Sequence, residues 1–191
     1  MKAHSIASTL AFTTAAFAGH DNVVQYPGIL TQWQANTIVG KYSAVLQGQG
    51  YDGMTISQTA ASVVAPNYVE ISDSILSLEG APVRNVDCRG ATLTDKLEQL
   101  GGASATSEQE WYEHVTAHPT QGIITHDILV AGGNNILWYW TFPCVGSRQY
   151  QVKGFNLLRI DINQQIYEAD IEFNSIAWGA DTHQLQQYCA A

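Results

Sequence analysis

The sequence predicts an α+β domain in which helices pack on one face of a bent antiparallel sheet. Two observations carry this prediction. In the first half of the chain, apolar residues recur at three- and four-residue spacing, which is typical of amphipathic helices. From Gly122 onward, short apolar runs are separated by glycine- and asparagine-containing turns, which is typical of strands. No repeat or composition break divides the chain, so one domain is expected.

The first predicted helix covers residues 28–47. Polar side chains occupy one side of it, and Gly48 and Gly50 end it. Its apolar stripe consists of Leu30, Trp33, Ile38, Val39, Tyr42, Val45 and Leu46.

Two shorter helices and one extended region follow. A helix over residues 55–65 should stop before the next residue, a proline, because the residue before proline avoids helical geometry. Residues 68–78 are predicted as a strand or a strand pair. Ser107 and Glu110 form a capping-box pattern that opens a helix through about residue 118.

The second half is predicted to be a four-strand antiparallel meander. Its strands cover residues 123–130, 136–142, 150–160 and 166–178, and Gly132-Gly133-Asn134 is a turn signal between the first two.

The strand over residues 136–142 is apolar on both faces. Leu137 and Tyr139 lie on one face, and the opposite face carries Ile136, Trp138, Trp140 and Phe142. One face can pack on the helices, and the other needs a second layer. A partner subunit would supply it, which predicts a homodimer through the sheet face. Cover from the C-terminal tail and residues 79–105, with a short helix over 92–100, is the alternative.

The N-terminus has the pattern of a secretory signal. Met1-Lys2 is positive, residues 5–17 are uncharged and mostly small or apolar, and Ala16-Phe17-Ala18 is a small-x-small cleavage pattern. The apolar run is too short to span a bilayer. We expect a signal peptide over residues 1–18 and a secreted domain over residues 19–191.

Composition excludes several other functions. The net charge of −9 and only 8 scattered lysine and arginine residues argue against nucleic-acid binding. No other run has the length of a membrane span. Cys88, Cys144 and Cys189 allow one disulfide in an oxidising compartment, and the pair stays open. No Cys/His spacing suggests a metal site.

Several strings resemble a known family. The runs Val-Lys-Gly-Phe-Asn-Leu-Leu-Arg-Ile over residues 152–160 and Ile-Glu-Phe-Asn over residues 171–174 are similar to ketosteroid-isomerase-like and SnoaL-like proteins of the NTF2-like superfamily. The resemblance covers residues 28–178, and the run over residues 152–160 is similar to that of SnoaL-like secreted proteins of filamentous fungi. It implies a cone: a strongly bent antiparallel sheet with about three helices around a pocket.

The family's isomerases move a proton next to a carbonyl group. A carboxylate takes the proton, and two hydrogen-bond donors hold the enolate oxygen. The segment Lys-Tyr-Ser-Ala-Val-Leu around Tyr42 is similar to the family's donor-tyrosine segment. Tyr42 also lies on the apolar stripe, where a buried phenol needs a hydrogen-bond partner. An ordinary core tyrosine is the alternative.

The base has two candidates. The run before Asp73 is similar to the family's base segment, but the match needs a shift of one residue, so Glu70 competes with Asp73. A carboxylate in a solvated loop is the alternative for either residue.

Asn156 takes the place of the family's neutral acid. It shares a face with Val152, Leu158 and Ile160, so its amide must be hydrogen-bonded. An amide donates at every pH, which keeps an oxyanion-holding function and puts steroid isomerisation in doubt. A structural asparagine that bridges two strands is the alternative.

Further candidates have weaker support. His126 alternates in phase with Ile124 and Ile128, which predicts an inward side chain, as a base or as a satisfied core histidine. Asp170 shares a face with Glu172 and Asn174, either at the wet end of the pocket or in solvent. SnoaL-like cyclases often use an acid on this strand, so Asp170 is a reserve base. Candidate substrate-binding residues are Trp138, Trp140, Phe142, Asn174 and Trp33.

Together these observations predict a cofactor-free isomerase or cyclase of a small enolisable carbonyl compound. The resemblance implies fungal secondary metabolism, where relatives couple maleic-anhydride units into maleidrides, although no residue selects that substrate. A carrier of a hydrophobic small molecule and a secreted interaction protein are the alternatives.

Overall fold

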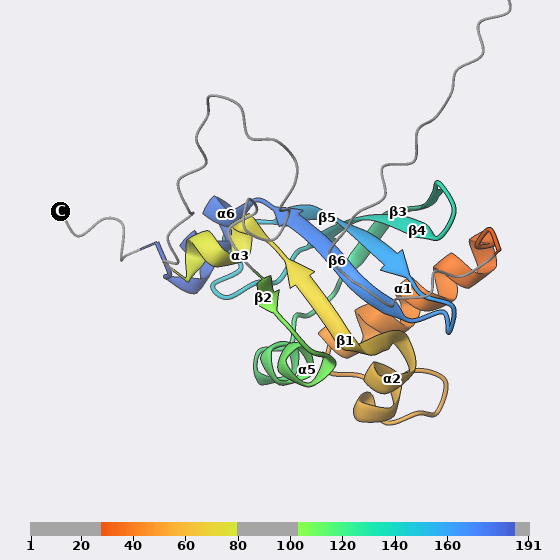
Figure 1. Ribbon diagram of the computed structural model, residues 1–191. Helices are drawn as coiled ribbons and strands as arrows, with labels where there is room; N and C mark the ends of the chain where they lie inside the picture. Colours follow the sequence, from red (N-terminus) through yellow and green to blue (C-terminus); the bar gives the residue numbers. More distant parts are fainter. Residues whose placement is uncertain (1–27, 80–102, 186–191) are drawn as a thin grey trace, which may run out of the picture.

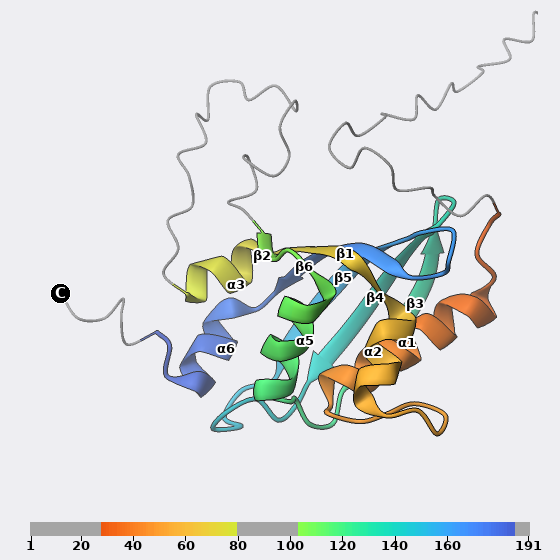
Figure 2. The ribbon, with the colours of Figure 1, turned by 60° about the horizontal axis from the view of Figure 1, so that its bottom comes forward.

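The computed structural model describes residues 28–79 and 103–185 (Figure 1). Their centre is a six-stranded sheet in the order β2-β1-β6-β5-β4-β3. Figure 2 shows three helices on the same side of this sheet: α1 (Gln32–Leu46), α2 (Ile56–Val63) and α5 (Glu108–Ala117). The predicted α+β class, with helices on one face of a curved sheet, is confirmed.

The predicted meander forms most of the sheet. β3 (Ile124–Ala131), β4 (Asn135–Phe142), β5 (Val152–Ile160) and β6 (Ile166–Phe173) pair antiparallel in chain order. β1 (Val64–Ile71) adds to β6 as a parallel strand, and β2 (Ala103–Ala105) pairs antiparallel with β1. The N-terminal half of the chain therefore also contributes strands.

Local caps explain where the helices begin. Thr31 with Gln34 opens α1, and Thr55 with Gln58 opens α2; both pairs make a complete capping box. The predicted pattern at α5 forms only half of one. Ser107 accepts from the backbone of Glu110, but the carboxylate of Glu110 accepts from the backbone of Thr106 at 2.7 Å.

Two predicted extended regions contain helices. Residues 68–78 are not a strand pair: β1 begins at Val64, ends at Ile71, and is followed by α3 (Asp73–Leu78). The last strand also ends earlier than predicted, at Phe173, and α6 (Ser175–Thr182) follows. In both places a polar residue, Ser72 or Asn174, caps the helix, whereas short apolar runs do not distinguish strand from helix.

The sheet buries one face. On one face of β4, each side chain of the set Ile136, Trp138, Trp140 and Phe142 is 6 % exposed or less, whereas Tyr139 on the other face is 41 % exposed. Leu129 of β3 and Phe155 of β5, on the same outer face as Tyr139, are each 48 % exposed. The short helix expected over residues 92–100, the signal over residues 1–18, Cys88 and Cys189 lie outside the described residues. Within them, Cys144 is a free thiol and no helix is long and apolar enough to cross a membrane.

Candidate functional site

A cavity of about 480 Å³ opens between the inner face of the sheet and α3, α5 and α6. One wall is almost entirely aromatic: the rings of Trp140 and Phe142 stack with centroids 4.0 Å apart, and those of Phe173 and Trp178 lie 5.2 Å apart. The apolar lining on this side consists of Trp138, Trp140, Phe142, Ile171, Phe173 and Trp178. Such a wall suits a flat or ring-bearing ligand.

Gly154 allows this wall to form. It lies on β5 between Trp140 of β4 and Phe173 of β6. A Cβ atom at this position would lie 2.6 Å from Trp140 Cζ2 and 2.6 Å from Phe173 Cβ. Only a residue without a side chain lets the two aromatic rings meet across the central strand.

A buried carboxyl group lines the same cavity as the aromatic wall. Glu70, on β1, lines the cavity and is 8 % exposed. Its Oε1 accepts from Ser104 Oγ at 2.9 Å, and its Oε2 accepts from Tyr68 Oη at 3.1 Å. Tyr68 Oη in turn lies 3.3 Å from the hydroxyl of Tyr42, which α1 supplies. Three elements thus bring their polar groups to one end of the cavity.

Burial governs the ionisation of this cluster. It raises the pKa of Glu70, while the hydrogen bonds from Ser104 and Tyr68 and the charge of His114 act in the opposite direction. Burial, reinforced by the charge of Glu70, also raises the pKa of Tyr42 and of Tyr68. Both phenols therefore stay protonated at physiological pH, and Glu70 is a stronger base than a carboxylate in water.

Asn156 supplies a second polar group. It lines the cavity, is 2 % exposed, and its Oδ1 accepts from Trp140 Nε1 at 2.7 Å. Because an indole N–H only donates, this bond fixes which end of the amide is oxygen. The NH₂ group makes no hydrogen bond within the described residues, and it remains as a donor for a ligand.

Glu70 and Asn156 stand apart on the inner face. Glu70 pairs with Ala169 of β6, whereas Asn156 pairs with Ile171 of that strand. Their backbones are therefore separated by two strand spacings, roughly 10 Å, and by two residues along the strands, about 7 Å. Because both side chains line the cavity, this gap leaves room for a ring-sized molecule between the carboxylate and the amide.

Asp73 does not belong to the cavity. It is exposed as the first residue of α3, and its backbone N–H donates to Glu172 Oε1 at 3.1 Å. The placement expected for Asp73 is wrong because Ser72 ends the strand and caps a helix there. Of the two candidate bases, Glu70 is the carboxylate that faces the cavity.

The inward orientation predicted for His126 is also wrong. The side chain is exposed, its Nε2 lies 2.7 Å from Thr141 Oγ1, and its ring lies 4.8 Å from that of Tyr139 on the outer face. A bulge in β3 between Thr125 and Asp127 inserts one residue, which breaks the alternation on which the prediction depended.

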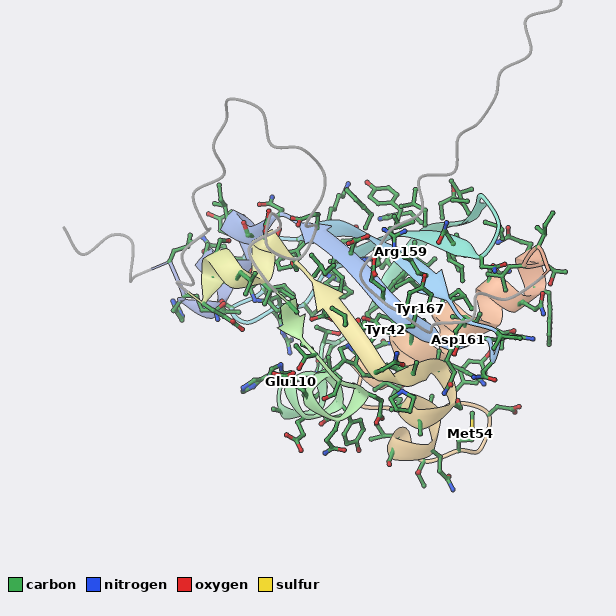
Figure 3. The ribbon with its side chains drawn as sticks, in the orientation of Figure 1. Tyr42, Met54, Glu110, Arg159, Asp161 and Tyr167 are labelled. Atoms are coloured by element: carbon green, nitrogen blue, oxygen red, sulfur yellow. The ribbon has the colours of Figure 1, made fainter. Side chains whose placement is uncertain are left out.

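Three more candidates lie outside the cavity lining. Asp170 is on the outer face, where its carboxylate pairs at 2.8 Å with Arg159 of β5, which is labelled in Figure 3. Asn174 caps α6 by accepting from the backbone of Ala177 at 3.1 Å. Trp33 is 75 % exposed on α1. Alternation explains the position of Asp170, because Ile171 and Phe173 take the inner face.

The structure adds residues that the sequence analysis missed. Tyr68 could have been found, because it shares a strand face with Glu70 two residues later. His114 and His118 also line the cavity, and their four-residue spacing on α5 was a usable signal. Ser104, on the short strand β2, had no signal of its own.

A curled sheet with helices around an aromatic cavity defines the class of small cone-shaped pocket proteins. The profile of the NTF2-like domain family matches residues 28–185, and the chain belongs to this family. No curated protein matches the sequence.

Several solved structures are similar to the chain at low identity. A steroid delta-isomerase from Pseudomonas aeruginosa is 12 % identical, with a TM-score of 0.48 over 87 % of this chain and 100 % of that one. A protein described as a SnoaL-like polyketide cyclase, from Jannaschia sp. CCS1, is 15 % identical, with a TM-score of 0.49 over 86 % and 98 %. An NTF2-like protein of unknown function from Mesorhizobium loti is 15 % identical, with a TM-score of 0.44 over 80 % and 99 %. These identities are too low to carry over residue roles.

Proposed function

We propose that the protein is a cofactor-free isomerase or cyclase that moves a proton next to the carbonyl group of a small, ring-bearing compound. The observation that carries the proposal is Glu70, a buried carboxyl group held by two hydroxyl donors beside an aromatic wall. Burial in such a site raises the pKa of the carboxyl group, and a general base is most effective when its pKa lies near the pH of the reaction.

Each polar group has a step in this reaction. Glu70 takes a proton from the carbon next to the carbonyl, and the electron pair of the broken C–H bond moves to the carbonyl oxygen. The NH₂ group of Asn156 donates to that oxygen as its charge develops. Isomerisation then ends when Glu70 returns the proton to another carbon. Cyclisation ends when the enolate carbon attacks a second carbonyl group, the π electrons of that group move to its oxygen, and Glu70 gives its proton to the alkoxide that forms.

Loss of deuterium exchange in a Glu70 variant is the test. The probe is 2-tetralone in D₂O, with incorporation at the carbons next to the carbonyl followed by NMR. We expect the full chain to accelerate exchange and Glu70→Gln to lose about 100-fold or more of that acceleration. The amide of this variant keeps an oxygen for Tyr68, so the fold should be retained. Asp73→Asn, in an exposed carboxylate outside the cavity, is the matched control.

Two outcomes contradict the proposal. If Glu70→Gln exchanges as fast as the unaltered chain, Glu70 is not the base. If the full chain binds 2-tetralone, seen as tryptophan quenching, without accelerating exchange of this probe or of a panel of cyclic ketones and anhydrides, the protein is a carrier.

The place of action is part of the proposal. The pattern over residues 1–18 supports export, and an alkyl-substituted maleic anhydride, which can lose a proton from the carbon attached to its ring, is one small carbonyl compound that would fit the reaction of a secreted fungal enzyme. N-terminal sequencing of the protein from the medium of a fungal expression host should begin at Gly19. A chain that stays inside the cell and begins at Met1 contradicts export.

A further inference from the structure

Tyr42, Tyr68 and Glu70 form a single hydrogen-bonded chain. The two phenol oxygens lie 3.3 Å apart, and Tyr68 Oη lies 3.1 Å from Glu70 Oε2. Each phenol carries one proton, and an ionised carboxylate only accepts. When Glu70 is ionised, the proton of Tyr68 therefore points to Glu70, and the proton of Tyr42 points to Tyr68. Tyr42 lines the cavity, and its hydroxyl then has only lone pairs left for a further partner.

Protonation of Glu70 removes this constraint. A neutral carboxylic acid has an O–H donor, so Oε2–H can donate to Tyr68, Tyr68 to Tyr42, and Tyr42 into the cavity. Only O–H bonds rotate in this reversal, and no proton changes its oxygen. Both O···O distances, 3.1 and 3.3 Å, exceed the usual value of about 2.8 Å, so no short, strong bond holds either direction.

We propose that Tyr68 is a positioning residue that couples Glu70 to Tyr42, so that Tyr42 donates to an oxyanion in the cavity only while Glu70 holds a proton. The inference builds on the function proposed above for Glu70. It also predicts the class of ligand: neutral compounds that give a proton to Glu70 inside the cavity, from the carbon next to the carbonyl in a ketone or from the hydroxyl group in an enol or phenol. The proton passes to Glu70 and the negative charge to the ligand oxygen, so the pair keeps its total charge.

The lining of the cavity favours the same ligand class. The described residues that line it include no lysine or arginine, and they include two carboxyl groups in addition to Glu70, those of Glu79 and Glu113. A compound that is already anionic in water would be repelled by these carboxylates and by the net charge of −9 of the chain. A neutral compound would not be repelled.

The titratable and charged groups around Glu70 determine the pH at which the direction of these hydrogen bonds reverses. Tyr42 faces it from α1, Tyr68 from its own strand, His114 from α5 and Glu79 from the end of α3. Burial is the main influence and raises the pKa of Glu70, the charge of His114 lowers it, and that of Glu79 raises it.

The test compares affinities and needs no turnover. The probe is 2,4-dinitrophenolate, which stays ionised from about pH 5 to about pH 9, and binding is followed by quenching of tryptophan fluorescence. At the acidic end, Tyr42→Phe should weaken binding about tenfold, because a hydrogen bond to a charged oxygen is lost. As Glu70 ionises, the ratio of the two dissociation constants should fall toward one. The negative charge of Glu70 repels the anionic probe in the unaltered chain and in Tyr42→Phe alike, so this repulsion cancels in the ratio.

Two further variants complete the design. In a Tyr68→Phe background, Tyr42 has no phenol to donate to, and the cost of Tyr42→Phe should no longer depend on pH. Tyr150→Phe, in an exposed tyrosine outside the cavity lining, should leave the affinity unchanged. A ratio that does not vary with pH while Tyr68 is intact overturns the inference. Because the assay measures binding only, its failure is distinct from a failure of the exchange assay.

Discussion

Replacement of Asn156 by leucine has two effects that the structure separates. Leucine keeps the size of the side chain but removes the oxygen that Trp140 Nε1 reaches at 2.7 Å. Trp140 is 2 % exposed, so its N–H cannot turn to bulk water. A buried, unpaired donor costs about 1–3 kcal/mol. For a domain of this size, that lowers the melting temperature by roughly 2–10 °C.

The same substitution removes the proposed oxyanion donor. Loss of one such donor lowers kcat by about 100- to 1,000-fold in enzymes that stabilise oxyanions. Thermal unfolding by circular dichroism and the 2-tetralone exchange rate would be measured on the same preparations of Asn156→Leu. An unchanged melting temperature would show that the Trp140–Asn156 bond contributes no stability. An unchanged exchange rate would show that the amide does not face the reacting oxygen.

Asn156→Asp is the matched variant. It keeps an oxygen for Trp140, but when ionised it has no donor for the substrate. Burial in an apolar site raises the pKa of such a carboxyl group. Relative to the unaltered chain, exchange by this variant should therefore be fastest at low pH, where the acid is neutral and can donate, and this ratio should fall as pH rises through the folded-state pKa of the new carboxyl group. The stability of the variant should fall over the same pH range. A ratio that rises with pH would refute the assigned role, because ionisation of Glu70 affects both proteins and cancels in it.

Three other predictions concern stability and assembly. The pKa of Glu70 is raised in the folded chain, so its protonated form stabilises the fold below about pH 4.5, and this contribution is lost as pH rises. Glu70→Gln should thus melt higher than the unaltered chain at pH 8 and equally at pH 4; equal melting at both values contradicts this. Asp181 Oδ1 accepts from Ser147 Oγ at 2.7 Å and from the backbone of Gln149 at 3.0 Å. Asp181→Ala should lower the melting temperature and speed proteolysis in the loop over residues 143–150, whereas cleavage elsewhere only would argue against this anchor. If the exposed sheet face forms the proposed homodimer, Tyr139→Glu should sediment as a monomer at concentrations where the unaltered chain is a dimer, and an unaltered monomer would exclude it.

The meander could be predicted because strand periodicity and turn residues agree along residues 122–173. In β4, alternation alone placed Trp138 and Trp140 on one face and Tyr139 on the other, and the burial of the two tryptophans beside the exposure of Tyr139 confirms this separation. The predictions fail where a single residue interrupts the alternation of a strand or ends the strand. A bulge in β3 moved His126 to the outer face, and no sequence pattern marked that bulge. Ser72 and Asn174 each end a strand and cap a helix within an apolar run.

The choice between Glu70 and Asp73 shows how much of the site followed from the sequence. The resemblance left both open, because its match needed a shift of one residue. Strand alternation separates them: Glu70 shares the face of Tyr68, whereas Asp73 follows Ser72 into a helix. The network itself could not be predicted, because Tyr42, Glu70 and Ser104 come from α1, β1 and β2 and meet only in the folded chain. That meeting alters the role expected of Tyr42, since its single proton goes to Tyr68 whenever Glu70 is ionised. In this cavity the donor that the resemblance implies therefore depends on the base, and Asn156 is the donor whose availability does not change with pH.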